Sequence, residues 1–184
     1  MMDREYVILY NELFRREIIP GSENEYRVVD KLKNLFREVV DWVKVVNIPT
    51  DSWFEEECIV ETSDYAFSCR VLPYVGKDVV EGNFVEAKLV EDKIVLLDNV
   101  EYPIVFIEFP EELDITKYIL LDLYRLGAIA VVFYDKYSGR YRRSVVNGDE
   151  NYSFKHGSPP PIPAVSIDRE DYLKLKNRRV KRIL

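Results

Sequence analysis

The chain offers few side chains that could carry catalysis. It holds one histidine, His156, and contains no HExxH motif, no His-x-Asp pair and no Cys-x-x-Cys pair. Zinc hydrolases need several His, Asp or Glu ligands and a general-base carboxylate beside the metal. His156 lies in a polar Gly/Ser/Pro segment, where no nearby sequence motif supplies an orienting carboxylate and a nucleophile. We therefore expect no catalytic residue, no metal site and no cofactor in this chain.

One segment alternates basic and aromatic side chains and is the best candidate for binding. Its members are Lys136, Tyr137, Arg140, Tyr141, Arg142 and Arg143. It follows a predicted buried parallel strand, and ligands tend to bind at the carboxyl edge of such sheets. These groups could hold an acidic group or a peptide backbone by hydrogen bonds and stacking. The simpler alternative is a solvated hairpin, with a short exposed strand at residues 140–146, whose arginines balance an acidic protein.

The elements that must position this segment are two short apolar runs with a helix between them. Residues 102–109 and 127–135 are bounded by proline or glycine, which is typical of buried strands. Apolar side chains recur between them at helical spacing: Ile115, Ile119, Leu123 and Leu126. Asp114 is predicted to cap this helix, and Gly127 to adopt a positive φ at its end. The pattern predicts a right-handed strand–helix–strand crossover with parallel strands, and a third strand at residues 164–167 beside the second.

Several pieces of this stretch resemble the protease-associated domain. They are KIVLL at residues 93–97, RLGAIAVVFYD at 125–135 and PIPAVSID at 161–168, with a similar lead-in strand at 69–87. Residues 18–38, with the turn GSENE, are similar to the N-terminal helical segment of co-catalytic zinc aminopeptidases. In that family a protease-associated domain is often inserted before or within the metallopeptidase domain. The sequence departs from the family at Asp92, where a glycine is usual, and at residues 107–113, which replace a "G.C.F" element.

The resemblance implies an α+β fold: a protease-associated-like β-barrel or sandwich with a β-α-β crossover, preceded by an N-terminal helical hairpin. We expect the hairpin and a first strand in residues 1–48 and the protease-associated-like domain in residues 49–184. Turn residues and β-branched content predict the other strands of a mostly antiparallel barrel. These strands are residues 55–62, 66–72, 83–91 and 93–100, with a tight turn at 91–92. After the crossover we expect a helix at residues 169–176 and a last strand at 180–184.

The N-terminal hairpin is predicted as helices at residues 5–16 and from Ser22 onward, followed by the first strand at 42–48. Ser22 precedes Glu25 by three positions, which is the spacing of a capping box. Two short helices cannot bury both apolar faces on each other. We expect them to pack on the β domain, on a metallopeptidase domain or on a second copy of the chain.

The resemblance implies a non-catalytic accessory module of an aminopeptidase-like protein, with its catalytic domain absent from this chain. Such a module shapes substrate access or protein contacts, so its partner is a protein or peptide. The alternative is a zinc aminopeptidase fragment whose active site is completed by a missing domain or another chain. A third interpretation is a structural dimer module that associates through the N-terminal helices.

Charge and apolar content limit the kinds of partner that the chain can bind and the cellular compartment that we expect for it. The formal net charge of -7 argues against nucleic acid, because no excess positive charge is present to displace counterions. No secretory signal is seen, and no apolar run approaches the ~20 residues that span a bilayer, so we expect a cytoplasmic protein without a membrane partner.

Glutamine is absent and charged residues are abundant, which suggests a thermophilic, archaeal-like source. We expect Cys58 and Cys69 to be buried thiols, with a disulfide between them as the alternative.

Overall fold

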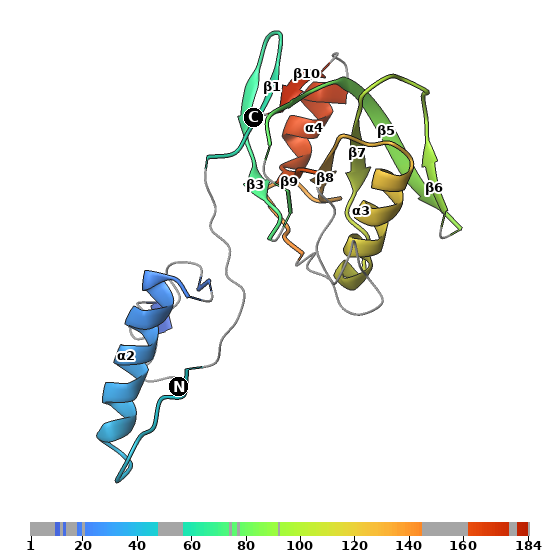
Figure 1. The fold of residues 1–184 in the computed structure, drawn as a ribbon. Coiled ribbons are helices and arrows are strands. Elements are labelled where there is room, and N and C mark those ends of the chain that lie inside the picture. The colour runs from blue at the N-terminus through green and yellow to red at the C-terminus, as the bar shows by residue number, and fades with distance from the viewer. Residues whose placement is uncertain are drawn as a thin grey trace. The chain divides into compact units, whose positions relative to one another are not determined.

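The structure is a computed structural model, shown in Figure 1. It describes residues 10, 11, 13, 18–19, 21–47, 57–73, 75–76, 78–91, 93–144, 162–176 and 180–183. The chain divides into two compact units, Met1–Phe54 and Glu55–Leu184.

The described part of the first unit is organised around helix α2, Glu23–Arg37. The Ser22 Oγ atom accepts the backbone N–H of Glu25 at 3.1 Å, and Glu25 Oε2 accepts the backbone N–H of Gly21 at 2.7 Å. These bonds satisfy donors at the start of the helix, and they confirm the predicted cap. Tyr10, Asn11 and Leu13 are helical, but most of the predicted helix at residues 5–16 lies outside the described residues.

The strand predicted at residues 42–48 is wrong over its described part, because residues 42–47 form neither helix nor strand. Strand propensity acts through pairing and packing with neighbours, and an apolar run alone does not supply a partner. Several large apolar side chains of this unit are exposed: Tyr26, Phe36, Val39, Val40 and Trp42. In α2, Val28 is buried.

The second unit is built on a six-stranded sheet of order β3-β9-β8-β7-β5-β6. These strands are β3 Arg70–Val71, β5 Asn83–Val90, β6 Lys93–Leu96, β7 Pro103–Glu108, β8 Ala130–Tyr134 and β9 Ala164–Ile167. β5, β7, β8 and β9 run parallel, while β3 and β6 pair antiparallel at the two edges. The predicted strand–helix–strand order with parallel strands is confirmed as β7, helix α3 (Thr116–Arg125) and β8, with β9 beside β8.

β5 follows the expected antiparallel arrangement on one side only, because it pairs antiparallel with β6 and parallel with β7. This strand lies parallel to β7, with Asn83 opposite Pro103. The backbone N–H of Asn83 donates to the Tyr102 carbonyl at 2.9 Å, and its side-chain amide donates to the Glu101 carbonyl at 2.8 Å. These two bonds fix the start of β5 against the segment that enters β7.

Both faces of the large sheet are covered by apolar side chains, which alternate along each strand. One face contributes Ile104, Phe106, Val132, Val165 and Ile167 to a core shared with Tyr172 and Leu175 of helix α4, Arg169–Lys176. The other face contributes Val105, Ile107, Val131, Phe133 and Ala164 to a core shared with Ile119, Leu120 and Leu123 of α3. β7, β8 and β9 are therefore buried on both sides, as their apolar sequences predict.

A second, four-stranded sheet of order β2-β1-β10-β4 is antiparallel throughout. Its strands are β1 Ile59–Thr62, β2 Ala66–Ser68, β4 Val80–Glu81 and β10 Val180–Ile183. The single strand predicted at residues 66–72 is instead two strands. β2 pairs with β1 in the small sheet, β3 pairs with β9 in the large sheet, and the chain crosses between the sheets at Cys69. The fold is α+β, as expected.

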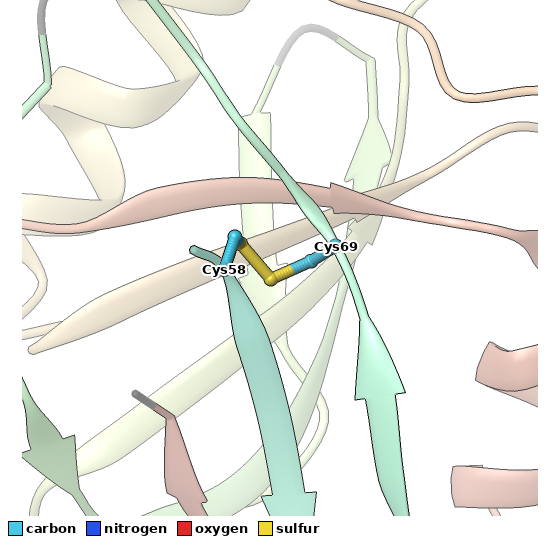
Figure 2. Close-up of a disulfide and its surroundings, with 2 residues drawn as sticks. All are labelled: Cys58 and Cys69. Atoms are coloured by element: carbon cyan, nitrogen blue, oxygen red, sulfur yellow. A yellow bond between two sulfur atoms is a disulfide. The ribbon is translucent and has the colours of Figure 1, made fainter. Parts of the chain in front are cut away.

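The expectation of two buried thiols is wrong, because Cys58 and Cys69 form a disulfide with a Cα–Cα distance of 5.1 Å (Figure 2). Cys58 directly precedes β1 and Cys69 directly follows β2. The Cys69 N–H donates to the Cys58 carbonyl at 3.0 Å, which extends the β1–β2 ladder by one pair. Two residues that lie directly opposite each other in an antiparallel pair have their Cβ atoms at a distance that allows a disulfide.

The ends of the predicted elements show mixed outcomes. Gly127 has φ +91, and the N–H groups of Gly127 and Ala128 donate to Tyr124 and Leu123, which is the predicted left-handed C-terminus of α3. The predicted Asp114 cap is wrong: a 3₁₀ turn, Leu113–Ile115, precedes α3, and Ile115 occupies the cap position without a side-chain bond.

Other predicted boundaries shift by a few residues. β6 ends at Leu96 rather than near residue 100. Of the strand predicted at residues 55–62, the described part is a strand from Ile59, and residues 55 and 56 lie outside the described residues. The tight turn is confirmed at Glu91, which has φ 48 between paired Val90 and Lys93, while Asp92 lies outside the described residues. The C-terminal helix and strand are confirmed as α4 and β10.

Candidate binding site at the carboxyl edge of the large sheet

The candidate segment follows β8 at the carboxyl edge of the parallel strands. The hairpin strand predicted at residues 140–146 is wrong over residues 140–144, which carry no strand, and residues 145 and 146 lie outside the described part. The backbone N–H of Arg140, at the start of that predicted strand, donates instead to the Asp168 carboxylate. The segment from Asp135 to Ser144 is therefore a loop, and we call it the edge loop.

Two carboxylates hold the backbone of the edge loop. Asp135 and Asp168 directly follow the neighbouring strands β8 and β9. Asp168 Oδ2 accepts the N–H groups of Gly139 at 2.5 Å and Arg140 at 3.1 Å, while its Oδ1 accepts the N–H of Glu170 at 2.8 Å. Asp135 Oδ1 accepts the N–H of Tyr137 at 3.0 Å. Asp168 thus caps α4 and anchors the loop with the same carboxylate.

Arg142 points toward the protein and joins the ends of β7 and β8. Its guanidinium donates to the carbonyls of Pro110 at 3.3 Å and Glu111 at 3.4 Å. Its Nε lies 3.5 Å from Asp135 Oδ2, and its Cζ lies 5.8 Å from the ring centroid of Phe109. With these contacts Arg142 has a positioning role in the loop.

The other candidate side chains lie nearer to solvent. Tyr137 is 53% exposed, and Lys136 Nζ and Arg140 Cζ lie 5.3 and 5.0 Å from the centroid of its ring. Lys136 Nζ also lies 2.6 Å from a carboxylate oxygen of Glu111. The hydrogen bond between them lowers the pKa of the Glu111 carboxyl and raises the pKa of the Lys136 ammonium. Tyr141 is exposed and Arg143 is half-buried.

The surroundings of Tyr141 give it a different character from Tyr137. Partial burial, followed by the charges of Asp171 and Asp168, raises the pKa of Tyr141. This phenol therefore stays neutral at ordinary pH and acts as a hydrogen-bonding group. The structure brings Lys136, Tyr137 and Arg140 together and places Arg142 under the loop.

Sequence reasoning missed the two aspartates that organise the loop. The signal was present: VVFY is followed by Asp135 and AVSI is followed by Asp168, so an acidic residue ends each of two adjacent parallel strands. It also missed a polar cluster on the α4 face, where the Tyr172 hydroxyl donates to the Glu86 carboxylate and Lys176 Nζ lies 2.9 Å from Glu86 Oε1. The ring of Tyr134 stacks on Tyr172 with centroids 3.6 Å apart.

Burial and internal hydrogen bonds shift the pKa values of the Glu86 cluster. Burial raises the pKa of Tyr172 to about 12, with the Glu86 hydrogen bond acting in the same direction. Burial acts to raise the pKa of Glu86 as well, but the hydrogen bonds from Tyr172 and Lys176 and the nearby lysine charges outweigh it, so the Glu86 pKa is lowered. The polar atoms of this cluster bind one another, and the cluster attaches α4 to the sheet.

Two general features bear on the kind of site. Within the described ranges, no three His, Cys, Asp or Glu side chains gather as a metal ion would require, and His156 lies outside those ranges. None of the helices in the described part of the chain has the length and apolar content needed to cross a bilayer.

Comparison with known proteins shows the fold. No family model matches the sequence, and no curated protein matches it. Among solved structures, the chain is similar to BSAP, a zinc aminopeptidase from Bacillus subtilis, with a TM-score of 0.68 and 15% identity over 96% of this chain and 41% of that one. It is also similar to an aminopeptidase from Aneurinibacillus sp. strain AM-1, with a TM-score of 0.52 and 15% identity over 96% of this chain and 42% of that one. The chain therefore spans about two fifths of each of these aminopeptidase chains.

Proposed function

We propose that this chain is a non-catalytic, protease-associated-like accessory module of an aminopeptidase-like protein. In that role it shapes substrate access or mediates protein contacts. The observation that carries the proposal is the coverage of the fold match: 96% of this chain, but 41% of the chain of a zinc aminopeptidase. A match to about two fifths of an aminopeptidase chain supports a segment of an aminopeptidase-like protein rather than a whole enzyme.

The sequence pieces that resemble the protease-associated domain support the proposal by their position. KIVLL begins in β6, GAIAVVFYD contains β8 and PIPAVSID contains β9, and all three strands belong to the six-stranded sheet. The chemistry of the edge loop also supports it. Its anchoring carboxylates accept backbone N–H groups, and its outward side chains are those of a binding surface rather than of an acid–base pair.

Metal analysis and a peptidase assay on the purified chain test the proposal. After incubation with zinc and removal of unbound metal, we expect less than stoichiometric zinc. Chromogenic aminoacyl substrates should show no turnover above the same buffer without protein. Stoichiometric zinc together with turnover would overturn the accessory assignment, since a catalytic centre would then lie in this chain.

The alternative, an enzyme fragment completed by another domain, is favoured by one observation. Large apolar side chains in the first unit are exposed, with Trp42 at 75% and Val39 at 77%. Exposed apolar groups of this kind suit a surface that another domain covers. We take that domain to be a metallopeptidase domain, because the chains that share the fold are more than twice as long.

A reconstitution experiment separates the two functions. The metallopeptidase domain that both proposals assign to the longer protein is assayed on a single aminoacyl substrate, alone and with this chain added. If this chain is an accessory module, that domain should be active alone, and adding this chain should change only the rates at which longer peptides are hydrolysed. The fragment alternative expects no turnover of the small substrate until this chain is added.

A further inference from the structure

We propose that Tyr137 and Arg140 form a docking point for a carboxylate group of a peptide segment in a partner protein. This inference rests on the proposed function and names the chemistry that such an interaction module would recognise. The two side chains are neighbours in the edge loop, at the carboxyl edge of the parallel strands.

The contacts of Arg140 differ from those of three other arginines in the described part of the chain. Arg125, Arg142 and Arg169 lie 3.2, 3.5 and 3.5 Å from the carboxylates of Asp122, Asp135 and Glu108. The Arg140 guanidinium instead lies 5.0 Å from the centroid of the Tyr137 ring. Stacking of this kind orients the planar group, whose N–H donors match the two oxygens of a carboxylate.

The backbone beneath these side chains is held by the protein itself. The N–H groups of Gly139 and Arg140 donate to Asp168, and that of Tyr137 donates to Asp135. Gly139 has φ +75, which lets the loop turn toward Asp168. Because the loop is ordered by these bonds before a ligand arrives, binding loses less conformational entropy.

The charges of the loop are separated between its two sides. Asp135 and Asp168 are buried beneath it, while Arg140, Tyr137 and Lys136 are exposed. Lys136 is partly neutralised by Glu111 at 2.6 Å, which leaves Arg140 as the donor best placed for an incoming anion. The face offered to solvent is therefore a guanidinium beside an aromatic ring.

A carboxylate on a peptide fits this face better than a polyanion does. The chain has a net charge of -7, and the summed field repels a long anion such as a nucleic acid. A single carboxylate in contact with Arg140 interacts mainly at short range, and its flanking residues can pack on the exposed ring of Tyr137. The carboxylate can come from an Asp or Glu side chain or from the C-terminus of a peptide.

Titration of the full ¹⁵N-labelled chain with three peptides tests the proposal. The first carries a single glutamate and has an amidated C-terminus, the second replaces that glutamate by glutamine, and the third has no acidic side chain but a free C-terminal carboxylate. We expect the first or the third peptide to shift the amide signals of residues 137–141. The glutamine peptide should bind at least fivefold more weakly than the carboxylate peptide that gives these shifts. The first and third peptides identify the source of the carboxylate.

Matched variants make the result specific. Arg140→Gln should weaken binding by about fivefold to tenfold, which corresponds to about 1.0–1.4 kcal/mol. Tyr137→Leu should weaken it by about threefold, because the ring no longer orients the guanidinium. Arg125→Gln, which removes the same charge from an exposed position paired with Asp122, should leave the affinity unchanged within twofold.

Three results would overturn the inference: a glutamine peptide that binds as tightly as the better-binding carboxylate peptide, equal losses in Arg140→Gln and Arg125→Gln, or no shifts in the edge loop with either carboxylate peptide. None of these depends on zinc or on turnover. Failure of the docking site is therefore distinguishable from failure of the accessory assignment.

Discussion

Arg142 and Asp135 form an ion pair at the base of the edge loop, with Nε 3.5 Å from Oδ2 of a carboxylate that is 1% exposed. The same guanidinium donates to the carbonyls of Pro110 and Glu111 beyond β7. One side chain thus connects the segments that follow two adjacent parallel strands. These contacts of Arg142 fix the edge loop to the ends of β7 and β8, so the loop is not a solvated hairpin.

Arg142→Met should lower the free energy of unfolding by about 2–3 kcal/mol. The substitution keeps much of the apolar stem but leaves a buried carboxylate without its charged partner. Urea unfolding followed by circular dichroism measures the difference. Arg125→Met is the matched control, because that arginine is exposed and pairs with Asp122 within one helix, and its loss should change stability by no more than about 0.5 kcal/mol.

The double variant Arg142→Met, Asp135→Asn should recover part of the stability lost in Arg142→Met, since the uncompensated charge is gone. If Arg142→Met is as mild as Arg125→Met, the ion pair contributes little. The edge loop would then be held mainly by Asp168 and not by the pair of Arg142 with Asp135.

The sequence shows local features of the fold well. Ser22 with Glu25, Gly127 after the α3 pattern, and the apolar runs of β7 and β8 each predict a structure that forms within a few residues. Capping boxes, left-handed C-termini and buried strands depend on near neighbours in the chain. For this reason the crossover and its helix ends can be predicted without knowledge of the rest of the molecule.

Contacts between distant segments are where sequence reasoning fails. Arg140 and Arg142 look equivalent in the sequence, but Arg142 reaches Asp135 and the end of β7, while Arg140 lies against Tyr137. Asp168 is 28 residues from Arg140 along the chain, and only the pairing of β8 with β9 brings it beneath the loop. Side-chain type gives the available chemistry, but strand order decides which partner each side chain meets.

The Cys58–Cys69 disulfide should stabilise the second unit by about 3 kcal/mol, because it closes a loop of sequence separation 11 in the unfolded chain. We expect Cys58→Ala, Cys69→Ala to lower the melting temperature by about 10 °C. Differential scanning calorimetry with and without reductant measures the effect. Reductant should lower the melting temperature of the natural chain and leave the double variant unchanged. An equal response of the two proteins would show that the disulfide is not the source of the stability.

Gly82 and Gly127 should respond differently to alanine. A Cβ on Gly82 would lie 2.2 Å from the Tyr102 carbonyl oxygen and 2.8 Å from Ile129 Cδ1, so the backbone entering β7 must shift, which costs about 3 kcal/mol. A Cβ on Gly127 meets nothing within 4 Å, and only its φ of +91 opposes the change, which costs about 1 kcal/mol. Denaturant unfolding of both variants gives the comparison. A loss for Gly82→Ala no larger than that for Gly127→Ala would contradict the close approach of β5 to β7.

Tyr172 should make the second unit lose stability in alkaline solution. Burial, and then the hydrogen bond to Glu86, raise the pKa of Tyr172 from 10.0 to about 12. The folded state therefore favours the neutral phenol. Its contribution is fully present below pH 10.0 and is lost as the pH rises through about 12. The difference amounts to about 2 kcal/mol, and the raised pKa of buried Tyr134 on the same face adds to it.

Urea unfolding at a series of alkaline pH values, compared between the natural chain and Tyr172→Phe, measures this contribution. The phenylalanine variant should be less stable near neutral pH, because Glu86 loses a hydrogen-bond donor, and its stability should fall less steeply above pH 10. Tyr102→Phe removes an exposed hydroxyl and should keep the slope of the natural chain. If Tyr172→Phe and the natural chain lose stability in parallel across this range, the alkaline transition comes from other groups, and the Glu86 cluster does not hold α4 on the sheet.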